Sequence, residues 1–377
     1  MKVKNNLAPQ FNDKESYNPN SFAKKDAGIV FLIFLFVFFL LSLSLNKFIK
    51  ATFKRETIIN HYYLINCVLT IISQLSIFLV AFIYSKIRRV SVLNGGGYAC
   101  KFNFLQILMA IILAMGVYFV FESVHMQIAE DYQTVFYGGK TRSYVPDAED
   151  LSISEIFFLL LEVFVLSIVL PAICEEALMR SIILRSLENY SKVFAIICSG
   201  IMFAIFHGNV SQILLQMLGG MAIGLSLVAT KNFMVSCFMH GAYNLFVANA
   251  SVVVGVLKDK NNNAYLFYRS TAVLVGICFI IIGLTYFIKL MVVSDKKTVK
   301  VNKAIPITKK VVLYDEKDNA VKEIYAYKTG EIKQYLNDGA LFLYDENFVS
   351  ANKNKGEVFP AIMLTISIIV GIAFIFI

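Results

Sequence analysis

The sequence predicts an all-α polytopic membrane helical bundle of about eight or nine transmembrane helices, with a small β-rich cytoplasmic insert before the last helix. Of the 377 residues, 58% are hydrophobic and only 16% are charged. The apolar residues gather in runs that approach the roughly 20 residues a helix needs to cross a bilayer. These runs do not alternate apolar with polar residues as barrel strands do, so helices must satisfy the backbone. The nine runs are 28–45, 62–85, 103–124, 153–173, 193–208, 212–229, 233–257, 270–293 and 358–377.

The first run is predicted to be a retained membrane anchor. A polar segment, 1–26, precedes it, and no small-residue cleavage pattern follows it, which argues against a secretory signal. The segment 1–26 is rich in Asn, Lys, Pro and Ser, so we expect a disordered N-terminal tail. The six cysteines are scattered singly, without metal-binding spacing, and are predicted to be ordinary buried side chains.

Loop charges predict the orientation of the chain in the membrane. The loop at 86–102 has four basic residues and no acidic one, so we place it in the cytoplasm, and the acidic loop at 125–152 lies on the opposite face. This places the N-terminus in the cytoplasm, although the basic loop at 46–61 disagrees. The Asn- and Lys-rich composition is typical of a low-GC bacterium, which predicts a multi-pass protein of the bacterial plasma membrane. The net charge of +9 is spread over span ends, so no nucleic-acid partner is expected.

The segment 294–357 is the only sizeable stretch of the chain outside the bundle, 27–293, and the last helix, 358–377. It alternates branched or aromatic residues with polar ones between turn pairs such as Asp318-Asn319 and Thr329-Gly330, which predicts short antiparallel strands. No residues in it have catalytic spacing. We therefore expect a small module that docks on the bundle or binds a protein partner, rather than a second active site.

Ionisable residues inside apolar runs are costly unless they are paired, so each is a functional candidate. The stretch "CEEALMR" contains three of them. Glu176 and Arg180 are four positions apart on one helical face, in the order that favours an ion pair. Glu175 lies about 100° further round the helix and must point at another neighbour. We expect Glu175 to be functional, whereas structure and function are equally good explanations of the Glu176–Arg180 pair.

Two histidines come from other apolar runs. Glu175 lies sixteen positions before Ser191 and His207 sixteen after it, so the two arms of a helical hairpin would carry them to similar depths. Phe203 lies one turn before His207 on the same face. His240 and Asn244 share a face of a later helix. The ordinary explanation of a lone membrane histidine is an interhelical hydrogen bond, but two of only four histidines at depth favour one shared site.

These residues form three motifs: Glu175-Glu176-x-x-x-Arg180, Phe203-x-x-x-His207 and His240-x-x-x-Asn244. In this order, they resemble the motifs of the CAAX protease and bacteriocin-processing family (CPBP, Abi-type) of intramembrane endopeptidases. The resemblance covers about residues 150–250. It implies a core of packed helices around a hydrated cavity, in which a water hydrolyses a peptide bond of a membrane-bound or hydrophobic peptide.

The resemblance also implies roles for the site residues. Glu175 would be the general base, with Glu176 a further catalytic candidate, and His207 would position the water. His240 and Asn244 would donate to the oxyanion, while Arg180 and Phe203 would support the site. Two alternatives for a cofactor stay open. Glu175, His207 and His240 could hold a divalent metal such as zinc, but no H-E-x-x-H helix is present and such a metal would leave no separate base, so the metal-free alternative is favoured.

Two non-protease functions also stay open. The chain could be a non-catalytic membrane binding or immunity protein that keeps the protease fold, as in bacteriocin self-protection. It could also be an ion-coupled transporter with Glu175 as proton carrier, although no repeated half-sequence supports that.

Overall fold

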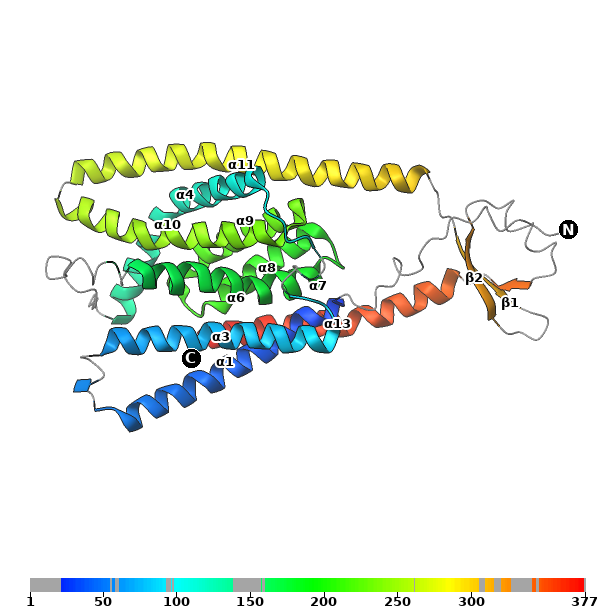
Figure 1. Ribbon diagram of the computed structural model, residues 1–377, viewed down its shortest axis with the longest axis horizontal. Coiled ribbons are helices and arrows are strands. Elements are labelled where there is room, and N and C mark those ends of the chain that lie inside the picture. Colours follow the sequence, from blue (N-terminus) through cyan, green and yellow to red (C-terminus); the bar gives the residue numbers. More distant parts are fainter. Residues whose placement is uncertain are drawn as a thin grey trace.

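The structure is a computed structural model of the whole chain, and its helices form a bundle in which most long helices run roughly side by side (Figure 1). The structure describes residues 22–54, 56–57, 61–92, 96, 98–137, 157, 160–260, 262–304, 309–314, 320–326, 341–343 and 346–375. Within this part of the chain, six helices are long and apolar enough to cross a membrane. Two shorter apolar helices, Lys192–Phe206 and Phe233–Ala248, add to these. The helical bundle predicted from the sequence is therefore found.

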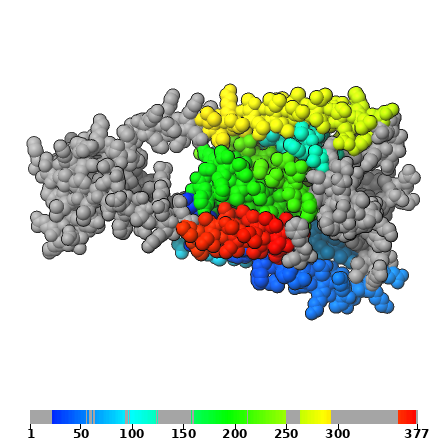
Figure 2. All heavy atoms as spheres, turned by 180° about the vertical axis from the view of Figure 1, so that it is seen from behind, coloured from blue at the N-terminus to red at the C-terminus, as the bar shows by residue number. Residues whose placement is uncertain are grey.

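One side of the bundle is built by three helices that lie far apart in sequence. They are α1 (Lys24–Thr52), α3 (Tyr62–Arg88) and α13 (Glu346–Ile375). Helix α1 packs against both others, and Figure 2 shows α13 in red across the central helices and beside α1 in blue. Gly28 permits the close approach of α1 and α13, because a Cβ atom there would lie 2.6 Å from the backbone of Met363.

The N-terminal tail predicted for 1–26 is too long at its inner end. Helix α1 begins at Lys24, and both Phe22 and Asp26 are buried. The Asp26 carboxylate accepts a 2.8 Å hydrogen bond from the Tyr84 hydroxyl and pairs with Nε of Arg88 at 2.9 Å. These contacts to α3 fix the start of α1, which hydropathy alone assigns to the polar tail. Residues 1–21 lie outside the described part.

The other side of the bundle is built by α4 (Phe104–Tyr137), α9 (Ile213–Thr230), α10 (Phe233–Lys260) and α11 (Asn262–Ala304). Helix α4 packs against the other three. Their contact is an apolar core that includes Leu113, Ile223, Met239 and Phe287. The outer faces of the bundle expose many large apolar side chains, as expected of a protein surrounded by lipid.

The centre of the bundle is one irregular helical segment, 160–187. It contains two π-helical stretches, η2 (Val163–Val169) and η3 (Met179–Leu184), on either side of α6 (Leu170–Leu178), and it ends with α7 (Arg185–Leu187). Together, α6 and η3 contact α1, α3, α8, α9 and α10. π-Helical turns are rare and occur frequently at functional sites. The two in this segment flank the acidic pair Glu175–Glu176.

Helix α8 (Lys192–Phe206) is held to α9 by glycines. A Cβ atom on Gly200 would lie 2.4 Å from the Met221 side chain and 2.9 Å from the Met217 carbonyl oxygen. A Cβ atom on Gly220 would lie 3.2 Å from the Cα atom of Gly200. This close backbone contact fixes the depth and rotation of α8, and thereby the position of the phenylalanine and histidine at its end.

Three strands lie between α11 and α13: β1 (Lys309–Tyr314), β2 (Ala320–Ala326) and β3 (Leu341–Leu343). They form an antiparallel sheet in the order β2-β1-β3, in which Val311 pairs with Ile324. Figure 1 shows β1 and β2 beyond the ends of α11 and α13. Both helices continue into the predicted insert 294–357, since α11 ends at Ala304 and α13 begins at Glu346. The turn pairs that predicted the strands lie outside the described residues, and the cytoplasmic location remains a prediction.

Candidate active site

Glu175 lies on α6 inside the bundle and is 5% exposed. Its Oε1 atom accepts a 2.7 Å hydrogen bond from Nε2 of Gln74, a buried side chain of α3. Its Oε2 atom is also buried but has no hydrogen-bond partner among the described residues. A buried carboxylate oxygen without a partner is costly and rare, and it is a place where a water or a substrate group binds. One oxygen of Glu175 is thus held in place while the other is available.

Glu176 is fully buried and has two partners. Its Oε2 atom lies 3.2 Å from Nε of Arg180, the pair predicted from their spacing. Its Oε1 atom lies 2.9 Å from Nδ1 of His240 on α10. A carboxylate only accepts hydrogen bonds, so Nδ1 of His240 carries the proton and Nε2 is left for other contacts. The sequence did not predict the contact between Glu176 and His240.

His240 stands between the two acids. Its Nε2 atom lies 3.7 Å from Oε2 of Glu175. This distance exceeds a direct hydrogen bond, but a single water can bind to both atoms at once. The two nitrogens of one imidazole therefore face two adjacent carboxylates, one in direct contact and the other within reach of a shared water.

Phe203 on α8 links the two histidines and the arginine. The ring lies edge-on to His207, with centroids 4.7 Å apart, and edge-on to His240, with centroids 5.5 Å apart. The Arg180 guanidinium lies 5.0 Å from the centroid of the same ring. A buried guanidinium gains cation–π stabilisation in such a position. The phenylalanine thus forms an apolar wall shared by the three groups.

His207 is the residue that ends α8. Its Nδ1 atom lies 2.8 Å from the carbonyl oxygen of Phe203, which can only accept, so Nδ1 donates and Nε2 is unprotonated in the neutral ring. Gly208 follows with a φ of +59°, a left-handed conformation in which glycine is unstrained. The chain therefore turns directly after the imidazole, which leaves His207 half-buried at the rim of the site.

Asn244 lies one turn after His240 on α10 but does not point at either acid. Its side-chain amide donates a 3.0 Å hydrogen bond to the carbonyl oxygen of Ser167 in η2. π-Helical turns leave some carbonyls without a regular helical partner, and a side-chain amide can satisfy one of them. Asn244 thus ties α10 to the π-helical segment that precedes α6.

The donor set does not have the arrangement of a three-ligand metal site. Among the described residues, no group of three or more His, Cys, Asp or Glu side chains is placed to hold a metal ion. The arrangement of Glu175, His207 and His240 as ligands of a divalent metal is therefore not found. One nitrogen of His240 contacts Glu176, and one nitrogen of His207 contacts a backbone carbonyl.

The site contains one residue that the sequence did not single out. Gln74 is a polar side chain inside the long apolar run 62–85, and that position is the only signal that could have found it. It contacts Glu175 across a sequence separation of 101 residues. Helical spacing predicts which residues share a face of one helix, but not which other helix will lie against that face.

Comparisons with known proteins agree with the three motifs. Residues 157–246 match the family model described as Rce1-like, Type II CAAX prenyl endopeptidase Rce1-like. The match covers less than half of the chain, begins before Glu175 and ends after Asn244. No curated protein and no solved structure matches. The resemblance to CAAX proteases is therefore confirmed for this segment, which contains every residue of the candidate site except Gln74.

Proposed function

Because residues 157–246 match the Type II CAAX prenyl endopeptidases, we propose that this protein is an intramembrane endopeptidase. The proposed substrate is a membrane-associated or hydrophobic peptide, which reaches the site from the lipid or its interface. The observation that carries the proposal is the environment of Glu175. One carboxylate oxygen is held by Gln74, and the other is buried, without a partner among the described residues, and 3.7 Å from an imidazole nitrogen.

Glu175 acts as general base. A water bound between Oε2 of Glu175 and Nε2 of His240 gives its proton to the carboxylate as its oxygen attacks the peptide carbonyl carbon. The carbonyl oxygen becomes an oxyanion in the tetrahedral intermediate. Glu175 then returns the proton to the peptide nitrogen, the C–N bond breaks, and a carboxylic acid and an amine leave the site.

Glu176 acts as a positioning residue in this scheme. It accepts the Nδ1 proton of His240 and so sets which tautomer is present, as second-shell carboxylates do for catalytic imidazoles. Arg180 balances the charge of Glu176 in a region of low dielectric. The Arg180–Glu176–His240 chain thus presents Nε2 of His240 toward Glu175.

His207 is the proposed partner of the substrate. Its Nε2 atom becomes a donor when the ring is protonated, and its place at the end of α8 lets it approach a peptide carbonyl from the rim. A donor placed at a developing oxyanion is worth a few kcal/mol of barrier, about 3 kcal/mol in measured cases. Asn244, whose donor is engaged by Ser167, holds the η2 segment in place.

The direct test is hydrolysis of a fluorogenic hydrophobic peptide by the purified full-length protein in lipid nanodiscs. E175Q keeps the size of the side chain but cannot take the proton, and we expect it to lose more than about a thousandfold in rate. E162Q is the matched control, because Glu162 precedes η2 on the same segment and contacts Cys67 on α3 instead of the site. A parallel reaction with chelator tests metal dependence.

Three outcomes separate the functions. Loss of cleavage in E175Q but not in E162Q supports the protease. Cleavage by E175Q at the rate of the unaltered protein contradicts the role of Glu175. If the unaltered protein binds the peptide with no hydrolysis, the non-catalytic binding function takes its place.

A further inference from the structure

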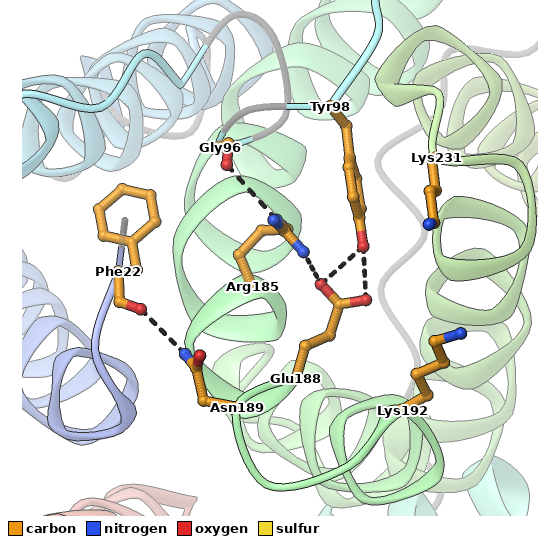
Figure 3. Close-up of a pocket in the computed structure, with 8 residues that line it drawn as sticks. All are labelled: Phe22, Gly96, Tyr98, Arg185, Glu188, Asn189, Lys192 and Lys231. Atoms are coloured by element: carbon orange, nitrogen blue, oxygen red, sulfur yellow. Dashed lines mark hydrogen bonds and ion pairs between the residues drawn. The ribbon is translucent and has the colours of Figure 1, made fainter. Parts of the chain in front are cut away.

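A cavity of about 350 Å³ lies apart from the acidic pair, at the end of the bundle where α7 meets α8. Figure 3 shows the side chains that line it, which come from the residue before α1, the loop before α4, the α7–α8 turn and the α9–α10 turn. The eight lining residues are Phe22, Gly96, Tyr98, Arg185, Glu188, Asn189, Lys192 and Lys231.

The backbone around this cavity is held firmly. The Ala99 amide donates to the Lys231 carbonyl at 3.0 Å, and the Phe233 amide donates to the Ala99 carbonyl at 2.8 Å. The Asn232 side chain bonds both backbone groups of Lys101, at 3.1 Å and 2.6 Å. The loop before α4 and the α9–α10 turn therefore form one unit. Because it is held by its backbone, exchange of the Lys231 side chain should leave it intact.

The single acid of the cavity is already neutralised. Glu188 pairs with Arg185, and the Tyr98 hydroxyl lies 2.6 Å and 2.8 Å from its two carboxylate oxygens. The Arg185 guanidinium lies over the Tyr98 ring at 3.8 Å. Burial raises the pKa of the Tyr98 phenol well above its ordinary value, so it stays a neutral donor. These contacts fix Glu188 at the middle of the cavity wall.

Two lysines add positive charge to this neutral pair. Figure 3 shows Glu188 between Arg185 on one side and Lys192 and Lys231 on the other. The eight lining residues carry three cationic groups and one anionic group, so the cavity has an excess of positive charge. Lys192 is also the first residue of α8, where the backbone amides of the first turn favour an anion.

The lysines lie where the chain passes from polar to lipid-exposed surface. Val193 and Phe194, which follow Lys192, are 58% and 40% exposed, and Phe102 and Phe104 on the neighbouring loop are exposed as well. Apolar side chains directly beside basic ones are typical of the level of the lipid headgroups. The basic loop at 86–102 predicts that this end faces the cytoplasm, where anionic lipids attract basic residues.

We propose that this cavity binds the phosphate group of an anionic lipid headgroup through Lys192 and Lys231. The lipid would join the α7–α8 turn to the α9–α10 turn, since one lysine comes from each. Basic pockets between transmembrane helices bind such headgroups in other membrane proteins. The same cationic groups could take the phosphate of a soluble compound, so the experiment must separate the two sources.

The test titrates the purified full-length protein with short-chain phosphatidylglycerol, with phosphatidylcholine of the same chain length and with inorganic phosphate, and measures bound ligand by native mass spectrometry. We expect phosphatidylglycerol to bind more tightly than phosphatidylcholine. K192Q/K231Q should weaken phosphatidylglycerol binding by about ten- to thirtyfold, and K192R/K231R, which keeps both charges, should retain it.

K47Q/K50Q is the matched control, because it removes two exposed lysines from α1, which do not line the cavity. Its affinity for phosphatidylglycerol should equal that of the unaltered protein. An equal loss in this control, or no loss in K192Q/K231Q, overturns the proposal. If inorganic phosphate binds, is lost in K192Q/K231Q and phosphatidylglycerol shows no preference, the site takes a soluble phosphate and the lipid assignment is wrong.

Discussion

Gln74 donates a 2.7 Å hydrogen bond to Oε1 of Glu175, although 101 residues separate the two in sequence. The matched segment 157–246 contains the glutamate but not the glutamine. Helix α3 therefore supplies a group that orients the proposed general base, and the site is complete only when α3 packs against α6.

Substitution Q74L should lower kcat by about tenfold to a hundredfold and change KM little, because the lost interaction orients the base rather than the substrate. Q74E should be more harmful, since it puts a second carboxylate beside Glu175. Steady-state kinetics on the fluorogenic peptide measure both. T70V is the control: Thr70 lies one turn earlier on α3 and bonds only the Asn66 carbonyl. A Q74L variant with unchanged kcat would remove Gln74 from the mechanism.

Substitution R180M should destabilise the protein by about 3–5 kcal/mol, because it leaves the buried Glu176 charge without its cation. The double variant E176Q/R180M should recover most of this stability, since both charges are then absent. It should not recover activity, because the orientation of His240 still depends on Glu176. Denaturant unfolding and peptide hydrolysis test the two parts. If R180M were as stable as the unaltered protein, the ion pair would not matter to folding.

Substitution G200V should displace α8 from α9 and destabilise the bundle by about 1–3 kcal/mol, since even a Cβ atom at this position meets Met221 at 2.4 Å. Activity should fall as well, because α8 carries Phe203 and His207. G241A is the matched control on α10. Its Cβ atom would lie 3.4 Å from Ile168, an ordinary contact, so thermal unfolding should show no loss. Equal effects of the two substitutions would contradict the close-packing argument.

Substitution N244A should cost about 1 kcal/mol of stability, because the Ser167 carbonyl loses its amide donor. We expect kcat to fall less than a hundredfold, since the proposed role is to hold η2. The opposite result, unchanged unfolding with a loss of about a hundredfold or more in kcat, would assign Asn244 to the oxyanion instead. Unfolding and kinetics measured on the same preparation distinguish the two roles.

Much of the site could be predicted because α-helical spacing is regular. Positions four apart share a face, so the Glu176–Arg180 pair and the contact of Phe203 with His207 follow from the sequence. The contact between His240 and Glu176 does not follow. An imidazole has two nitrogens and can face both members of an adjacent acidic pair, which spacing within one helix does not reveal.

The number of membrane spans was harder to predict than the presence of the bundle. Hydropathy identifies apolar runs, but it does not show where helices begin, end or change pitch. Asp26 is polar and yet buried at the start of α1, because Tyr84 and Arg88 of α3 meet it there. The segment 160–187 changes between α- and π-helix, which no apolar pattern indicates.

The two π-helical stretches have a consequence for how this chain tolerates insertion and deletion. A π-helical turn holds about one residue more than an α-helical turn, so its removal shifts the register of everything beyond it. Deleting one residue within Val163–Val169 would rotate the acidic pair by roughly 100° relative to the preceding helix. Glu175 would then face away from the amide of α3, even though every side chain of the three motifs was still present. Lengths inside this stretch are thus as restrictive as the identities of the acids that follow it.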